Sequence, residues 1–154
     1  MESIYKALPV KLNPFISLIV LFFIAFVPHA LKIGEVKKKA KESDGKVKYS
    51  VANSRAIGTL VCDDTPAGLR IAALAGCHTN GLEAFSYFAA AILSAVVTNV
   101  PKDVVEGAAA LFIGIRVLYT IVYLSPLNGS LRSLIWGTGL LVAFNLIYIA
   151  STYY

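Results

Sequence analysis

Hydrophobic residues gather into four long segments of the chain, separated by short polar connections and one long one. An α-helix needs about 20 mostly apolar residues to cross the hydrocarbon core of a membrane, at roughly 1.5 Å per residue. The segments that meet this requirement are approximately residues 12–33, 68–100, 104–124 and 131–154. The pattern predicts an all-α membrane protein, a four-transmembrane-helix bundle in a single domain over residues 1–154.

The polar connections predict how these helices are arranged. "PKD" at 101–103 and "SPLNGS" at 125–130 are short, so the last three helices should pack as antiparallel neighbours. The connection at about 34–67 is longer and basic, and its stretch "GEVKKKAKESDGKVKYS" has too few apolar residues to fold alone. We therefore expect disorder only in this loop.

Lysine and arginine predict the orientation of the chain in the membrane. Eight of them lie between residues 32 and 55, whereas the N-terminal segment has only Lys6 and Lys11 and the second connection only Lys102. Cytoplasmic loops carry the excess of positive charge, so the basic loop is predicted to be cytoplasmic and both termini to lie on the other side. The membrane would be the inner membrane of a bacterium or the endoplasmic reticulum of a eukaryote.

Composition agrees with a membrane protein and argues against two other classes. Of the 154 residues, 57% are hydrophobic and 15% charged, whereas soluble domains have about 25% charged residues. The net charge of +5 comes largely from one loop beside the spans, which favours contact with anionic lipids over nucleic acid. The two cysteines, Cys62 and Cys77, have no metal-ligand or disulfide spacing, and Cys77 should be a packed thiol.

Polar residues inside the predicted spans gather at one depth on three helices. Asn80 and Glu83 are three residues apart on the second span and therefore share a face. Counted from the outer end at Val100, Glu83 lies roughly 25 Å along the helix, near the cytoplasmic edge of the membrane. Further polar side chains at this side are Arg116, Tyr119 and Tyr123 on one stripe of the third span, and Arg132 and Ser133 at the start of the fourth.

Pairing of these groups can be predicted from their depth. Arg116 lies about 12 Å from the inner end of its span, deep enough to require a partner. Glu83 is the only carboxylate at comparable depth in the middle of a span, so we expect an ion pair between Arg116 and Glu83. His78 points away from Asn80 and is expected to be a solvated interfacial side chain.

Two interpretations of this polar cluster remain open on physical grounds. The groups can satisfy one another and hold the bundle together, with Arg132 extending toward the headgroups. Alternatively, they form a pocket for an anionic ligand, since the first turn of the fourth helix also offers free backbone N–H groups. Such a pocket could activate a thiol, and a hydrophobic co-substrate could enter from the lipid.

At these motifs the sequence resembles the MAPEG superfamily, the membrane-associated proteins in eicosanoid and glutathione metabolism. "HTNGLEAFSYF" is similar to the Asn-x-x-Glu signature of the second helix in that family. "RVLYTIVYL" is similar to its third-helix Arg-x-x-(His/Tyr)-x-x-x-Tyr pattern, and "LRSL" to its fourth-helix Arg-Ser. The resemblance covers about residues 68–154 with a compatible first helix, and it implies a subunit that assembles as a homotrimer.

The resemblance also implies glutathione as co-substrate, bound near the cytoplasmic side between neighbouring subunits. Glu83 would accept a hydrogen bond from its amino group, and Arg132, aided by Ser133, would stabilise the thiolate, which is the reactive form of a thiol. The residues implied to line the glutathione site are Asn80, Glu83, Arg116, Tyr119 and Tyr123.

The chain departs from the family pattern at three positions. Gly76 stands where many relatives have arginine, and Thr79 where some catalytic members have a basic residue. Trp136 stands where several enzymes have tyrosine. Lys32, at the inner end of the first span, is a candidate replacement for the missing positive charge.

Three functions follow as hypotheses. The first is a glutathione transferase or peroxidase that acts on lipophilic electrophiles or lipid hydroperoxides. The second is a non-catalytic lipid-binding or accessory protein on the same scaffold, suggested by the missing basic residues. The third is a proton-coupled transporter built on Glu83, which the position of Glu83 near one membrane face disfavours. The expected partners are further copies of the chain, membrane lipids and a lipophilic small molecule, and no metal site is expected.

Overall fold

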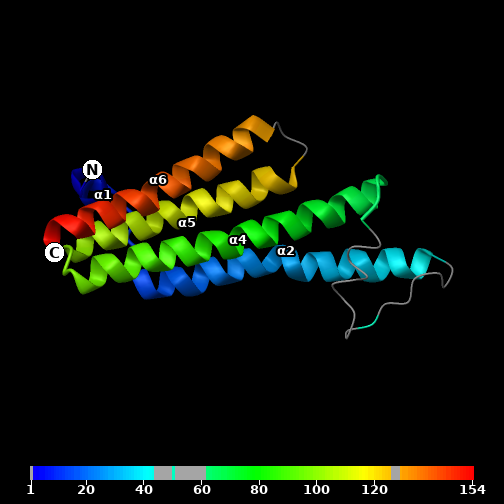
Figure 1. Ribbon diagram of the computed structural model, residues 1–154, viewed down its shortest axis with the longest axis horizontal. Coiled ribbons are helices and arrows are strands. Elements are labelled where there is room, and N and C mark those ends of the chain that lie inside the picture. The colour runs from blue at the N-terminus through cyan, green and yellow to red at the C-terminus, as the bar shows by residue number, and fades with distance from the viewer. Residues whose placement is uncertain (1, 44–49, 51–61, 126–128) are drawn as a thin grey trace.

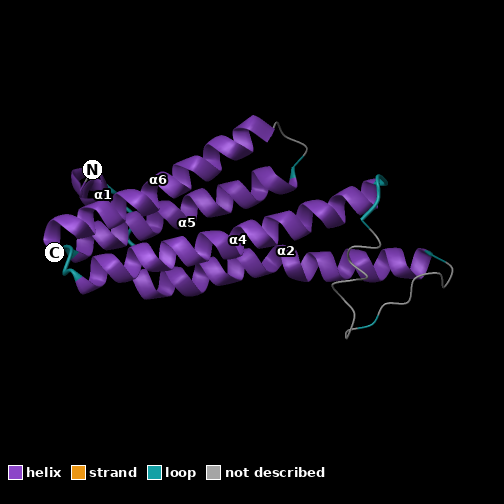
Figure 2. Ribbon diagram, in the orientation of Figure 1, coloured by secondary structure: helices purple, strands orange, loops and turns teal. Residues whose placement is uncertain are grey.

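The computed structural model describes residues 2–43, 50, 62–125 and 129–154, and every regular element in these ranges is a helix (Figure 2). A short helix, α1 (Glu2–Ala7), precedes four long ones: α2 (Pro14–Glu42), α4 (Pro66–Val97), α5 (Lys102–Leu124) and α6 (Gly129–Tyr153). All four long helices have the length and apolar composition needed to span a membrane. The predicted all-α class and the four predicted spans are confirmed.

The long helices run side by side, with both chain termini at the same end of the bundle (Figure 1). α4 contacts α2, α5 and α6, and α5 also packs against α6, so the last three helices are antiparallel neighbours as predicted. α2 and α4 extend past α5 and α6 at the opposite end (Figure 1). α4 has 32 residues, which corresponds to about 48 Å of helix against about 30 Å of hydrocarbon.

The first spanning helix continues into the lysine-rich segment, where the sequence pattern predicted a disordered loop. α2 extends to Glu42 because Val36 and Ala40, four residues apart on one face, are both buried. Lys39 forms an ion pair with Asp63 and donates a hydrogen bond to the Thr65 hydroxyl over 3.0 Å. The prediction of disorder was therefore wrong up to Glu42. The rest of the basic loop, including Lys46, Lys48 and Arg55, lies outside the described residues.

Small residues let the helices approach closely at the centre of the bundle. Phe88 of α4 and Phe112 of α5 stack face to face, with ring centroids 3.9 Å apart. Close approach of helices in a membrane depends on small side chains at the contact. The alanines that are completely buried here are Ala84, Ala91 and Ala95 of α4, Ala108 and Ala109 of α5, and Ala143 of α6.

The N-terminal helix α1, which the sequence pattern did not predict, packs against α5. Gly107 permits this contact, since a Cβ there would collide with the Tyr5 carbonyl oxygen. The Tyr5 hydroxyl donates a hydrogen bond to Asn145 Oδ1 of α6 over 3.1 Å. Lys11 Nζ donates to the carbonyl oxygens of Tyr5 (2.7 Å) and Asp103 (3.0 Å). These contacts tie the first residues of the chain to the end of the bundle opposite the basic segment.

The contact between α2 and α4 corrects the expectation for His78. Its Nδ1 lies 2.9 Å from the Ala25 carbonyl oxygen, and its ring lies 4.7 Å from that of His29. Because a carbonyl oxygen only accepts, Nδ1 must carry the proton. Pro28 has no N–H to donate to the Ile24 carbonyl oxygen, so α2 lacks one backbone hydrogen bond next to this contact. His78 is thus an interhelical contact rather than a solvated side chain.

Gly81 of α4 lies in close contact with Ala25 of α2, and replacing it with alanine tests the packing of these two helices. The new Cβ would lie 2.6 Å from Ala25 Cβ and 2.9 Å from its Cα, which cannot move aside. We expect Gly81→Ala to lower the free energy of unfolding by about 1–3 kcal/mol, measured by SDS titration in mixed micelles. Gly34→Ala is the control because a Cβ added at that position would have no atom of the described chain within 4 Å. Equal unfolding midpoints for the two variants would contradict this account.

Candidate functional site

A cavity of about 210 Å³ lies between α4, α5 and α6 and brings together residues that the sequence predicted as a site. Its walls come from one residue of α4, two of α5 and three of α6: Asn80, Tyr119, Tyr123, Arg132, Ser133 and Trp136. All of these except Trp136 were predicted as site residues from the sequence. The structure thus brings polar side chains from three helices to one cavity.

The wall contributed by α5 is a stripe of one helix. Arg116, Tyr119 and Tyr123 follow one another at three- and four-residue spacing, which places them on the same face. The Arg116 guanidinium carbon lies 4.3 Å from the centroid of the Tyr119 ring, and the rings of Tyr119 and Tyr123 are 5.5 Å apart. A cation over an aromatic face is attracted by the ring electrons. The stripe therefore holds the arginine against the inner wall of the site.

The wall contributed by α6 is its first two turns. Arg132 is exposed, and its guanidinium carbon lies 4.7 Å from the centroid of the Tyr123 ring. The first turn of a helix also presents free backbone N–H groups and the positive end of the helix dipole. Ser133 donates its hydroxyl proton to the Gly129 carbonyl oxygen over 3.2 Å, so its oxygen can accept from a ligand. This wall favours negative charge.

Arg116 is a buried charged side chain whose hydrogen-bond donors are only partly satisfied within the described chain. It is only 2% exposed, and its Nη2 donates one hydrogen bond, to the Asn80 carbonyl oxygen over 3.3 Å. Within the part of the chain that the structure describes, Arg116 Nε and Nη1, Asn80 Oδ1 and the Tyr87 hydroxyl have no hydrogen-bond partner. Buried charges and polar groups without partners cost several kcal/mol. These atoms therefore have free hydrogen-bonding capacity toward further polar groups.

The expected ion pair between Arg116 and Glu83 was wrong. Among the residues that the structure describes, no ion pair joins the two, and Glu83 is exposed whereas Arg116 is buried. The reason is which side of α4 faces the bundle. Ala84 is completely buried, and successive helix residues are turned by about 100°, so Glu83 faces out of the bundle. Its carboxylate remains available on the outer surface of α4.

Three other predicted or discussed positions lie apart from the cavity. Lys32 is half-buried on α2 and does not line it. Gly76 lies under Tyr123, since a Cβ at this position would collide with the Tyr123 hydroxyl. Thr79 is exposed and donates its hydroxyl proton to the Ala75 carbonyl oxygen over 3.2 Å. No positive charge therefore reaches the cavity from positions 76 and 79.

Sequence reasoning missed two members of this region. Trp136 lines the cavity, although the sequence had marked it only as a departure from the family pattern. The Tyr87 hydroxyl is one of the buried groups without a partner in the described chain, and its ring packs edge-on against Phe112 at 6.0 Å. Helical periodicity could have found Tyr87, because it follows Asn80 by seven residues and so lies on the same face.

Comparison with known proteins agrees with this architecture. Residues 15–152 match the model of the MAPEG family, a range that contains all four spanning helices almost completely and every predicted site residue. No curated protein and no solved structure matches the chain. With four apolar helices and this match, the protein is an integral multi-pass membrane protein. The match covers most of the chain and confirms the family that the sequence resembles: the chain belongs to the MAPEG family.

Proposed function

We propose that this protein is a membrane-bound, glutathione-dependent transferase or peroxidase that acts on lipophilic electrophiles or lipid hydroperoxides. The observation that carries the proposal is the buried Arg116, with two nitrogens lacking partners in the described chain, beside a cavity that Arg132 lines. Two positive charges and several hydrogen-bonding groups suit a small thiol that carries carboxylates. Membership of the family, whose proteins act in eicosanoid and glutathione metabolism, supports the same choice.

The size of the cavity supports a site completed by a second copy of the chain. About 210 Å³ falls below the roughly 300–1,000 Å³ of typical ligand pockets, so a tripeptide needs a further wall. In a homotrimer the neighbouring subunit would supply it. The exposed Glu83 could then accept a hydrogen bond from the amino group of glutathione, and Lys32 would have to contribute from a neighbouring copy. Asn80, Arg116, Tyr119 and Tyr123 would hold the remainder of the peptide.

Arg132 would stabilise the thiolate of glutathione. A positive charge beside a thiol lowers its pKa, and a shift of two units corresponds to about 2.7 kcal/mol in favour of the anion. With an electrophile, the thiolate sulfur would bond to carbon while the leaving group departs with the bonding electrons. With a hydroperoxide, the sulfur would take one oxygen and release an alkoxide, and a second glutathione would then give the disulfide and water.

A second candidate function is favoured by Gly76 and Thr79. Neither position provides a positive charge, and the Tyr123 hydroxyl fills the space beside Gly76. A site with fewer cations binds glutathione less tightly. In that case the chain would be a non-catalytic protein of the same family that binds lipids and presents them to a partner. This candidate predicts lipid binding without thiol chemistry at any glutathione concentration.

The role of Arg132 can be tested by its replacement with alanine. We expect Arg132→Ala to lower the rate of glutathione conjugation to an aryl halide about a hundredfold near pH 7, because the bound thiol would no longer ionise. Arg132→Lys keeps the charge and should retain part of the activity. The ultraviolet absorbance of bound thiolate should fall with the rate, while size-exclusion chromatography shows an unchanged oligomer. Undiminished turnover in Arg132→Ala would exclude the proposed mechanism.

The role of Glu83 can be tested separately by calorimetry of glutathione binding to purified protein. Glu83→Gln should weaken binding about tenfold, the loss expected for one charge-assisted hydrogen bond. The unfolding midpoint should not change, since Glu83 makes no ion pair within the described chain. Glu106→Gln is the control. Glu106 pairs with Lys102 in the first turns of α5 and does not line the cavity, so this variant should leave glutathione binding unchanged. Absence of binding by the wild type at millimolar glutathione would favour the lipid-binding candidate instead.

A further inference from the structure

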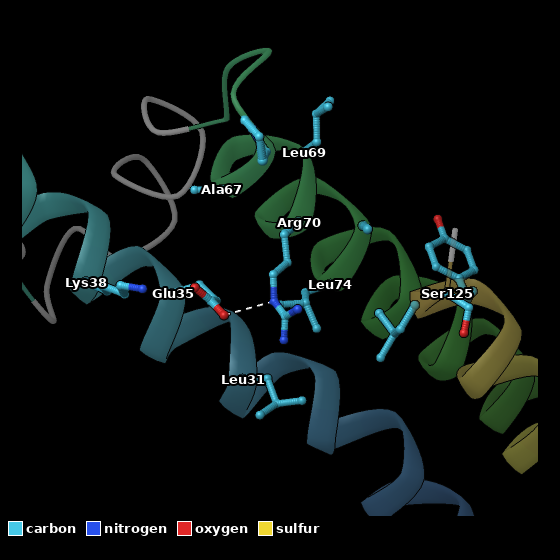
Figure 3. A pocket seen from close by; sticks show the side chains of 12 residues that line it. Leu31, Glu35, Lys38, Ala67, Leu69, Arg70, Leu74 and Ser125 are labelled. Carbon is cyan, nitrogen blue, oxygen red and sulfur yellow. Dashed lines mark ion pairs between the residues drawn. The ribbon is translucent and has the colours of Figure 1, made fainter. Parts of the chain in front are cut away.

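A second and larger cavity, of about 810 Å³, lies between α2, α4 and α5 at the end of the bundle that carries the lysine-rich part of α2 (Figure 3). This volume lies within the usual range for ligand pockets of about 300–1,000 Å³. Tyr123 and Leu124 at the end of α5, with Ser125 directly after it, form the third wall. Because Tyr123 also lines the smaller cavity, the two cavities adjoin at this side chain.

The charged part of the wall comes from two helices. Arg70 forms an ion pair with Glu35, with Arg70 Nε 2.9 Å from Glu35 Oε1, and this pair links α4 to α2 across the cavity (Figure 3). The Arg70 side chain is 63% exposed, and its guanidinium presents five N–H donors, of which the one on Nε lies at Glu35 in this pair. Lys38, one turn beyond Glu35 on α2, is exposed and forms no ion pair with any described residue. Two positive charges and one negative charge thus face the cavity.

The apolar part of the wall lies deeper in the bundle. Leu31 precedes Glu35 and Lys38 on the same face of α2, nearer to the middle of the helix. On α4, which runs the other way, Leu74 lies one turn deeper than Arg70 and is buried. The end of the cavity nearer the middle of the bundle is therefore lined by leucines, and the end nearer the lysine-rich part of α2 is cationic. This gradient matches a molecule with an apolar tail and an anionic head.

We infer that this cavity binds an anionic amphiphile, with its acyl chain along Leu31, Leu74 and Leu124 and its carboxylate or phosphate at Arg70 and Lys38. Glu35 pairs with the Arg70 guanidinium at the mouth and so competes with an anionic headgroup for its positive charge. Cationic pockets between transmembrane helices on one membrane side recognise lipid headgroups in this way. The same chemistry fits a free fatty acid and an anionic membrane phospholipid. The site requires no thiol, so it stands apart from the proposed catalytic function.

Binding can be measured with the full chain in phosphatidylcholine nanodiscs, titrated with a dansyl-labelled fatty acid in the absence of glutathione. Empty nanodiscs give the background from partitioning into lipid. The wild type should show saturable binding. Arg70→Gln and Lys38→Gln should each weaken it about tenfold, the loss expected for one charge-assisted hydrogen bond. Leu31→Trp, which narrows the apolar wall and leaves every charge in place, should also weaken binding.

Two control variants separate a specific site from general effects. Lys41→Gln removes one positive charge from α2 at a position that does not line the cavity, and it should change affinity by less than about twofold. Glu35→Gln breaks the contact with Arg70 but keeps its charge, so binding should be unchanged or tighter. Equal losses in Lys41→Gln and Arg70→Gln, or loss in Glu35→Gln, would overturn the inference.

Competition identifies the source of the ligand. Displacement of the labelled fatty acid by oleate alone would assign the cavity to free fatty acids. Displacement by phosphatidylglycerol included in the nanodiscs would assign it to anionic membrane phospholipids. Absence of saturable binding by the wild type would overturn the inference, whatever the outcome of the glutathione experiments.

Discussion

The structure depends on how a permanently charged guanidinium is accommodated inside an apolar bundle. Arg116 cannot lose its charge under ordinary conditions, and it is almost completely buried. Its surroundings come from two helices: the Asn80 carbonyl of α4 accepts one hydrogen bond, and the Tyr119 ring of α5 lies against the guanidinium. Arg116 Nε and Nη1 remain without partners in the described chain, and this is a cost to stability. Under the proposed function, a bound ligand would supply those partners, as expected where a buried charge serves a ligand.

The parts of the site that could be predicted from the sequence are those fixed by depth along a helix. The rise per residue sets the depth, so counting placed Asn80, Arg132 and the stripe of α5 at the same level. Facing direction was less predictable, because it depends on which neighbour each helix packs against. Glu83 turns outward rather than toward Arg116, and His78 turns toward α2 rather than solvent. Sequence periodicity alone does not identify the packing partner.

The parts of the fold that could not be predicted depend on contacts between distant residues. α1 has six residues, far fewer than the roughly 12–15 that an isolated helix needs to be stable in water. It forms because Gly107 leaves room for Tyr5, about a hundred residues away. The extension of α2 to Glu42 likewise depends on burial of Val36 and Ala40 beneath a charged surface. In the sequence these two apolar residues stand among lysines, so the hydrophobic pattern that would predict a helix is weak there.

Gly76 shows why a departure from a family pattern has to be interpreted in its structural setting. From the sequence it is a missing arginine, and hence a weaker anion site. In the structure it is also the space into which the Tyr123 hydroxyl projects. Tyr123 in turn supports the Arg132 guanidinium with its ring and forms a wall of both cavities. Any side chain at position 76 would displace Tyr123, and with it the support for Arg132. The glycine is thus a condition for this arrangement of the α6 arginine, and for the position of the side chain at which the smaller and the larger cavity adjoin.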